Sequence, residues 1–122
     1  MNVHRLLFSI GIFALLVTQL LAQETEQGQR IDFAKDIQPI LRASCYSCHG
    51  SDAQEGGLRL DNRARAFVGG DNGKAIVSGD ITKGLLLTLI KGTDEDLGRM
   101  PPEGEGTPLT EQQITLIQNW IA

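Results

Sequence analysis

The chain has 122 residues, a formal net charge of −4 and a hydrophobic share of 41%. This length fits one domain with one small core, and the composition argues against both a disordered chain and a multidomain enzyme. Lysine and arginine do not cluster anywhere in the sequence, which excludes the usual electrostatic footprint of a nucleic-acid-binding protein. Basic protein surfaces are better partners for a mildly acidic chain.

The N-terminal 22 residues have the pattern of a secretory signal. A short basic start precedes an apolar run from Leu6 to Leu21, and cleavage after Ala22 would complete the signal. Leu20 is a poor match to the small residue preferred near a cleavage site, so an uncleaved N-terminal membrane anchor is the alternative. Either interpretation predicts an exported protein, located in the periplasm or the cell envelope. Residues 23–30 contain no apolar side chain and are expected to form a flexible lead.

Two helical segments are predicted in the first half of the domain. Asp32 is a candidate N-cap for a helix over residues 33–43, where apolar residues recur at helical spacing. Pro39 lies inside this segment and predicts a kink or a restart of the helix. Asp61 is expected to cap a second, short helix that runs through Phe67.

Two further helices are predicted in the second half. Asp80 is expected to cap a segment that contains the leucine-rich run 85–90 and stops at Gly92, and this run should be deeply buried. A capping-box pattern at residues 110–113 precedes apolar residues at helical spacing, which predicts a final helix that ends near Ile121.

The connections between these helices are expected to be long loops. Twelve of the 14 glycines lie between Gly50 and Gly106, and no alternating strand pattern persists. The sequence therefore predicts a mainly α domain over residues 31–122, built from short helices and glycine-rich loops. Few aromatic residues are available for its core, which gives weak support for a cofactor that fills it: Phe33, Tyr46, Phe67 and Trp120.

The sequence Cys45-Tyr46-Ser47-Cys48-His49 is a haem attachment motif. Its two thiols, three positions apart, can each add across a haem vinyl group, and the following histidine can then bind the iron. A disulfide between the two cysteines and a thioredoxin-like redox pair are the alternatives. The redox pair would need a strand before the motif, where a helix is predicted. Structural zinc is excluded, because only three cysteine or histidine residues follow the signal and four ligands are needed.

Counting the remaining ligand types indicates the second axial ligand. Beyond residue 22, His49 is the only histidine and Met100 is the only methionine, so ligation by two histidines of one chain is excluded. Met100 precedes Pro101-Pro102, which would hold its loop extended and present the thioether to the far face of a haem. Ligation by a lysine, or a filler role for Met100, are the alternatives. Ligation by histidine and methionine leaves no iron position free, which predicts electron transfer and no enzymatic activity of the domain itself.

These segments together resemble the planctomycete-type cytochrome c domain over residues 31–121. Besides the attachment motif, the resemblance is carried by Ile31-Asp32-Phe33, Ile37-x-Pro39-Ile40-Leu41, Gly56-Gly57-Leu58-Arg59-Leu60-Asp61, Ala75-Ile76-Val77-x-Gly79-Asp80, Met100-Pro101-Pro102 and Trp120-Ile121. The sequence departs from the family pattern at Ser78, where proline is common. Members of the family often continue into large additional domains.

The resemblance implies the class I cytochrome c fold, in which the N- and C-terminal helices cross beside one covalent haem. It implies that Cys45 and Cys48 are the thioether positions, that His49 and Met100 are the axial ligands, and that the haem pocket is lined by Leu58 and Leu60. The cofactor would be a single haem c.

We therefore expect a monohaem carrier of single electrons, or the haem module of a larger exported redox protein. Its partners would be redox proteins or an attached redox domain, with no nucleic acid, and a membrane only if the N-terminal segment is uncleaved. A haem-based sensor or small-ligand binder with a displaceable distal ligand is the alternative function. The candidates for neutralising the haem propionates are Arg42, Arg59 and Arg99.

Overall fold

Six short helical elements form the regular structure of residues 30–122, which are the part of the chain that the computed structural model describes. The proposed signal at 1–22 and all but the last residue of the lead at 23–30 lie outside this part. Ile31–Ala122 form one compact unit. Within it no strand occurs beyond two isolated bridges, which confirms the mainly α prediction. The elements are η1 (Phe33–Ile37), α2 (Gln38–Ser44), η2 (Glu55–Gly57), α3 (Arg63–Val68), α4 (Leu85–Lys91) and α5 (Glu111–Ile121).

The first predicted helix consists of two consecutive elements. Asp32 caps η1, a π-helical turn, because its side chain accepts a hydrogen bond from the N–H of Lys35 at 3.1 Å. The α-helix α2 then begins at Gln38 with Pro39 in its first turn, where the fixed φ of proline suits the start of a helix. The structure thus confirms the Asp32 cap and the restart near Pro39.

The prediction that Asp61 caps the short helix α3 is wrong. Asn62 is the cap, and its side chain accepts a hydrogen bond from the N–H of Arg65 at 3.1 Å. Asp61 instead forms an ion pair with Arg59 at 2.6 Å. The more favourable partner for the Asp61 carboxylate is a charged guanidinium, so the neighbouring asparagine caps the helix.

The predicted cap of the leucine-rich helix is also wrong. α4 follows Gly84, which provides no side-chain cap. The carboxylate of Asp80 is occupied within its own turn, since it accepts hydrogen bonds from the N–H and hydroxyl of Thr82 and pairs with Lys83 at 2.8 Å. The predicted end of the helix is confirmed: Gly92 adopts φ 68° at the C-cap, a left-handed conformation that favours glycine.

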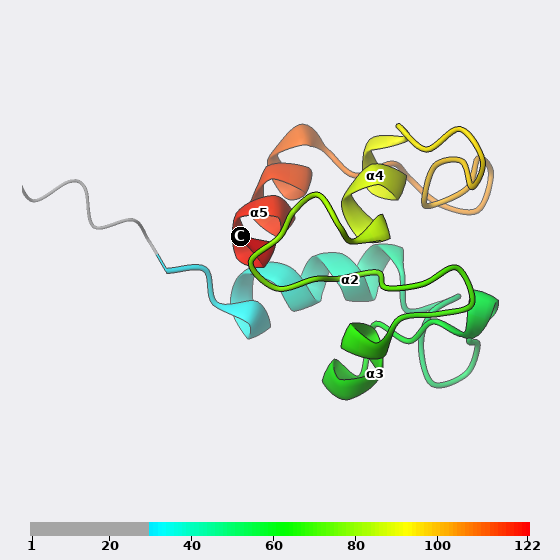
Figure 1. The fold of residues 1–122 in the computed structure, drawn as a ribbon, viewed down its shortest axis with the longest axis horizontal. Helices are drawn as coiled ribbons and strands as arrows, with labels where there is room; N and C mark the ends of the chain where they lie inside the picture. Colours follow the sequence, from blue (N-terminus) through cyan, green and yellow to red (C-terminus); the bar gives the residue numbers. More distant parts are fainter. Residues whose placement is uncertain (1–29) are drawn as a thin grey trace, which may run out of the picture. The chain divides into compact units, whose positions relative to one another are not determined.

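The core lies where the first and last helical segments meet. α5 carries the predicted capping box between Thr110 and Gln113, and it packs against η1 and α4. The side chains of Ile37 and Ile117 are 0% exposed at this junction. Figure 1 shows α4 and α5 on one side of α2 and α3 on the other. None of the helices between residues 30 and 122 has the length and apolar character needed to span a membrane.

Candidate functional site

A single cavity collects all six site residues predicted from the sequence. Its volume is about 470 Å³, within the range of roughly 300–1,000 Å³ that is typical of ligand sites. The cavity lies between the segment that follows α2 and the connection from α4 to α5. Its lining includes Cys45, Cys48, His49, Leu58, Leu60 and Met100.

The attachment motif is a helical continuation of α2. The N–H of Cys45 donates to the carbonyl oxygen of Leu41 at 2.8 Å, and the N–H of His49 donates to the carbonyl oxygen of Cys45 at 2.8 Å. The N–H of Cys48 donates to the same Cys45 carbonyl at 3.2 Å. These backbone hydrogen bonds fix both thiols and the imidazole on one turn at the cavity wall.

The segment after the motif folds back onto it. The N–H of Glu55 donates to the carbonyl oxygen of Cys48 at 3.0 Å, and the N–H of Leu60 donates to the carbonyl oxygen of His49 at 2.9 Å. This pairing brings Leu58 and Leu60 to the same cavity. The fold-back requires glycine at position 50, because a Cβ there would overlap the carbonyl oxygen of Tyr46.

The two cysteines have free thiols, so this structure does not contain the disulfide that was the alternative. Cys45 is buried and Cys48 is half-buried. Burial raises the pKa of the Cys45 thiol to about 11, with a further contribution from the neighbouring Cys48. Both cysteines line the cavity, where a covalently attached group would need their thiols.

The donor set fits a covalently bound haem. The Nδ1 atom of His49 is buried and lacks a hydrogen-bond partner among residues 30–122. A buried polar atom without a partner is unfavourable, so this imidazole is suited to bind a further group. Two thiols, an imidazole and a thioether around an apolar cavity are the side chains that a c-type haem requires. In the described part of the chain, no group of three or more Cys, His, Asp or Glu side chains is arranged to hold a metal ion by itself.

Met100 reaches the cavity from the α4–α5 connection. Its backbone N–H donates to the carbonyl oxygen of Leu89 at 2.9 Å, which ties this loop to the end of α4. The Met100 side chain is half-buried. The structure therefore brings the thioether and the imidazole of His49 to one cavity, although 50 residues separate them in the sequence.

Part of the cavity wall was not anticipated from the sequence. Leu85 and Leu89 of α4 are half-buried and line the cavity together with Leu86 and Ile90, whereas the whole leucine run was expected to be deeply buried. Leu87 is buried but does not line it. Five of the six residues from 85 to 90 are apolar, which is more than one helix face can hold. That excess indicates a helix that faces the core on one side and a second apolar body on another.

The arginines proposed for the haem propionates do not line the cavity. Arg59 donates two hydrogen bonds to Asp61, at 2.9 and 2.6 Å, and these lower the pKa of the Asp61 carboxyl. Arg42 and Arg99 are exposed, and Arg99 lines an adjoining pocket that shares Leu97, Met100 and Pro102 with the cavity. Among Asp, Glu, Lys and Arg residues, those that line the cavity are both acidic: Glu55 and Glu105.

Comparison with known families supports the motif-based interpretation. Residues 45–104 match a family described as "Planctomycete cytochrome C". The matched range begins at the first cysteine of the attachment motif and includes Leu58, Leu60 and Met100. No curated protein and no solved structure matches the chain significantly.

Proposed function

Because residues 45–104 place this chain in the planctomycete cytochrome C family, we propose that it is a monohaem c-type cytochrome with a class I fold that passes single electrons. The observation that carries this proposal is the common cavity of the attachment motif and Met100. Two segments that are distant in the sequence supply the complete set of side chains for one haem c.

Each of these residues has a defined task in the proposal. The sulfur atoms of Cys45 and Cys48 would form thioether bonds to the haem vinyl groups, and the His49 imidazole would bind the iron. The Met100 thioether would be the second ligand to the iron. When bound, the haem supplies an iron that changes its oxidation state by one electron.

The surrounding protein favours electron transfer over ligand binding. Leu58, Leu60, Leu85 and Leu89 give the cavity an apolar wall, and apolar surroundings together with a thioether ligand raise the reduction potential. The hydrogen bond from Met100 to Leu89 limits the movement of the loop that carries the thioether. If His49 and Met100 both held the iron, the chain would leave no position on it for a substrate.

The test is to produce the protein with a c-type haem maturation system. Denaturing electrophoresis should retain haem on the chain, and the matched variant Cys45→Ser/Cys48→Ser should lose it. The reduced protein should show a six-coordinate absorption spectrum that carbon monoxide does not change. Rapid carbon monoxide binding would instead support a haem-based sensor or small-ligand binder, and absence of covalent haem would exclude both functions.

We also infer that the protein is exported and that it exchanges electrons with redox proteins or with an attached redox domain. Covalent haem attachment and the signal-like segment at 1–22 support export to the periplasm or cell envelope. Fractionation of cells followed by mass spectrometry tests this inference. A mature chain that starts at Gln23 is expected, whereas an intact N-terminus in the membrane fraction would show an anchor, and a cytoplasmic holoprotein would contradict export.

A further inference from the structure

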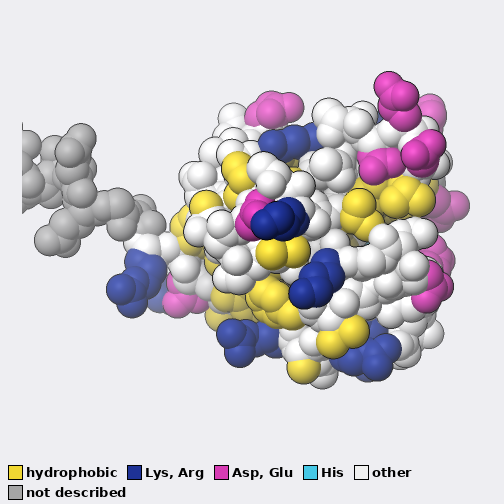
Figure 2. Space-filling view, viewed as in Figure 1, with side chains coloured by type: hydrophobic (Ala, Val, Ile, Leu, Met, Phe, Trp, Pro, Cys, Tyr) yellow, Lys and Arg dark blue, Asp and Glu magenta, His cyan; other side chains and the backbone are white. Residues whose placement is uncertain are grey.

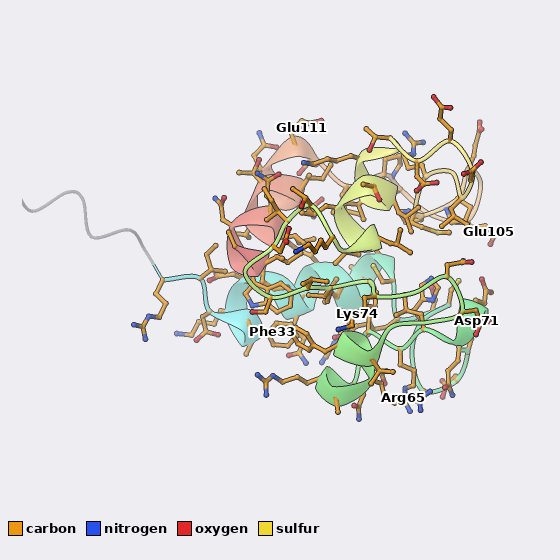
Figure 3. The ribbon with its side chains drawn as sticks, viewed as in Figure 1. Phe33, Arg65, Asp71, Lys74, Glu105 and Glu111 are labelled. Atoms are coloured by element: carbon orange, nitrogen blue, oxygen red, sulfur yellow. The ribbon has the colours of Figure 1, made fainter. Side chains whose placement is uncertain are left out.

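The cavity is bordered by acidic side chains from separate segments. Glu55 and Glu105 line it and are exposed. Asp71 lies beside the first of these, since its N–H donates to the carbonyl oxygen of Gly56 at 2.7 Å, and Glu103 lies in the same loop as Glu105. Figure 3 shows Asp71 and Glu105 on the same side of the domain. We call Glu55, Asp71, Glu103 and Glu105 the acidic rim.

The negative charge of the domain is concentrated in the α4–α5 connection, which contributes Glu103 and Glu105 to the rim. The α4–α5 connection, residues 92–110, carries five acidic residues and one arginine, a net charge of −4, whereas the other residues from 30 onward carry eight acids and nine bases. The ion pairs in the described part of the chain join Arg59 to Asp61 and Lys83 to Asp80, so the rim carboxylates are unpaired. Figure 2 shows most of the visible acidic side chains along the edge of the domain that holds this connection.

Apolar side chains lie between the carboxylates of the acidic rim. Leu97 is 37% exposed, Met100 is half-buried and Pro102 is exposed, and all three line the cavity. An apolar centre within a charged border is the usual anatomy of a protein interface. Complementary charge at such a border increases the association rate and selects the partner.

We propose that the acidic rim and the apolar residues within it are the docking surface for a redox protein with a lysine- and arginine-rich face. This inference rests on the proposed function, because electrons would leave or enter through the same cavity. Charge complementarity favours a basic partner over a second copy of the chain, since the described residues outside the α4–α5 connection are nearly balanced in charge.

Binding of a lysine-rich peptide tests the surface without any redox reaction. The isotopically labelled holoprotein is titrated with decalysine at low ionic strength, and amide chemical shifts are followed by NMR. We expect shifts at 55–57, 71–73 and 94–106, and their loss as salt is added. Glu55→Gln/Glu105→Gln should weaken binding about tenfold, while the matched control Glu111→Gln, which lies outside the rim, should leave it unchanged.

Small oxidants of opposite charge provide a second readout. The ferrous protein transfers one electron to tris(phenanthroline)cobalt(III), giving ferric protein and cobalt(II), or to ferricyanide, giving ferrocyanide. Stopped-flow rate constants should fall with ionic strength for the cationic oxidant and rise for the anionic one. The double rim variant should reduce the first rate constant by about tenfold at low salt and increase the second.

These experiments test the docking surface and the cytochrome function independently of each other. Absence of covalent haem would refute the cytochrome function, yet peptide binding would still test the rim. The docking proposal is overturned if the shifts centre elsewhere, or if Glu111→Gln has the same effect as the rim variant. Concentration-dependent self-association through the rim would also overturn it, since a second copy would then be the occupant.

Discussion

The backbone N–H of Met100 donates a hydrogen bond to the carbonyl oxygen of Leu89 at 2.9 Å. This bond places the methionine near the end of α4, a helix whose Leu85, Leu86, Leu89 and Ile90 form part of the same cavity wall. The position of the thioether is thus set by the packing of α4, in addition to the two prolines that follow Met100. A loop held in this way offers its side chain to the cavity with little additional ordering cost.

The first prediction concerns the sulfur atom itself. Met100→Leu keeps the apolar volume and removes the thioether, so covalent haem should be retained while carbon monoxide binds the reduced iron rapidly. The absorption band of the ferric iron–thioether bond should also disappear. Leu97→Met, which keeps Met100 and adds a thioether on the exposed side, serves as the control and should remain unreactive toward carbon monoxide. A Met100→Leu protein that resists carbon monoxide would assign the second ligand to another residue.

The second prediction concerns the turn after the attachment motif. Gly50→Ala places a Cβ against the carbonyl oxygen of Tyr46, so the motif must shift or the fold-back must open. We expect a loss of about 1–3 kcal/mol in the free energy of unfolding and a lower yield of covalent haem. Chemical denaturation and haem staining measure the two effects. Ser51→Ala, at the neighbouring exposed position, should change neither; equal stability of both variants would rule out this steric role.

The third prediction concerns the core between α5 and the N-terminal helical segment. Ile117 is 0% exposed, and Ile117→Ala leaves a cavity that the packed helices cannot fully close. The expected cost is about 2–5 kcal/mol in the free energy of unfolding. Thr115→Ala removes an exposed side chain of the same helix and should stay within about 0.5 kcal/mol of the unchanged protein. A small effect of Ile117→Ala would place the core elsewhere.

The fourth prediction is a dependence of stability on pH. Hydrogen bonds from Arg59 hold the pKa of Asp61 below its usual value of 3.8, so the pair stabilises the fold at neutral pH. This contribution diminishes once the pH falls below the pKa of the unfolded chain, and it is lost below the folded pKa. The difference in melting temperature between the unchanged protein and Arg59→Gln should therefore shrink below about pH 4.

Its control is Arg65→Gln, which removes an exposed guanidinium that forms no ion pair among the described residues. The melting-temperature difference for this variant should not show the same decrease at low pH. A pH-independent difference for Arg59→Gln would contradict the proposed role of the Arg59–Asp61 pair.

Functional groups and helix caps could be predicted from the sequence wherever one short segment contains all the atoms involved. The attachment motif is one example, because its two thiols and imidazole lie on a single turn. The α5 capping box is another, since Thr110 and Gln113 satisfy each other's backbone groups. The caps at Asp61 and Asp80 were mispredicted because each carboxylate has a nearby cation, which the capping pattern does not take into account.

What the sequence by itself determined is the donor set: two cysteines, one histidine and one methionine beyond residue 22. Only the tertiary structure decided that these donors share a cavity, that Leu85 and Leu89 face it, and that Glu55 and Glu105, rather than arginines, border it. The physical reason is the distance along the chain over which sequence patterns act. Residue identity and helical spacing constrain neighbours along the chain, whereas the cavity depends on how α4 and the α4–α5 connection pack against a motif about 50 residues away.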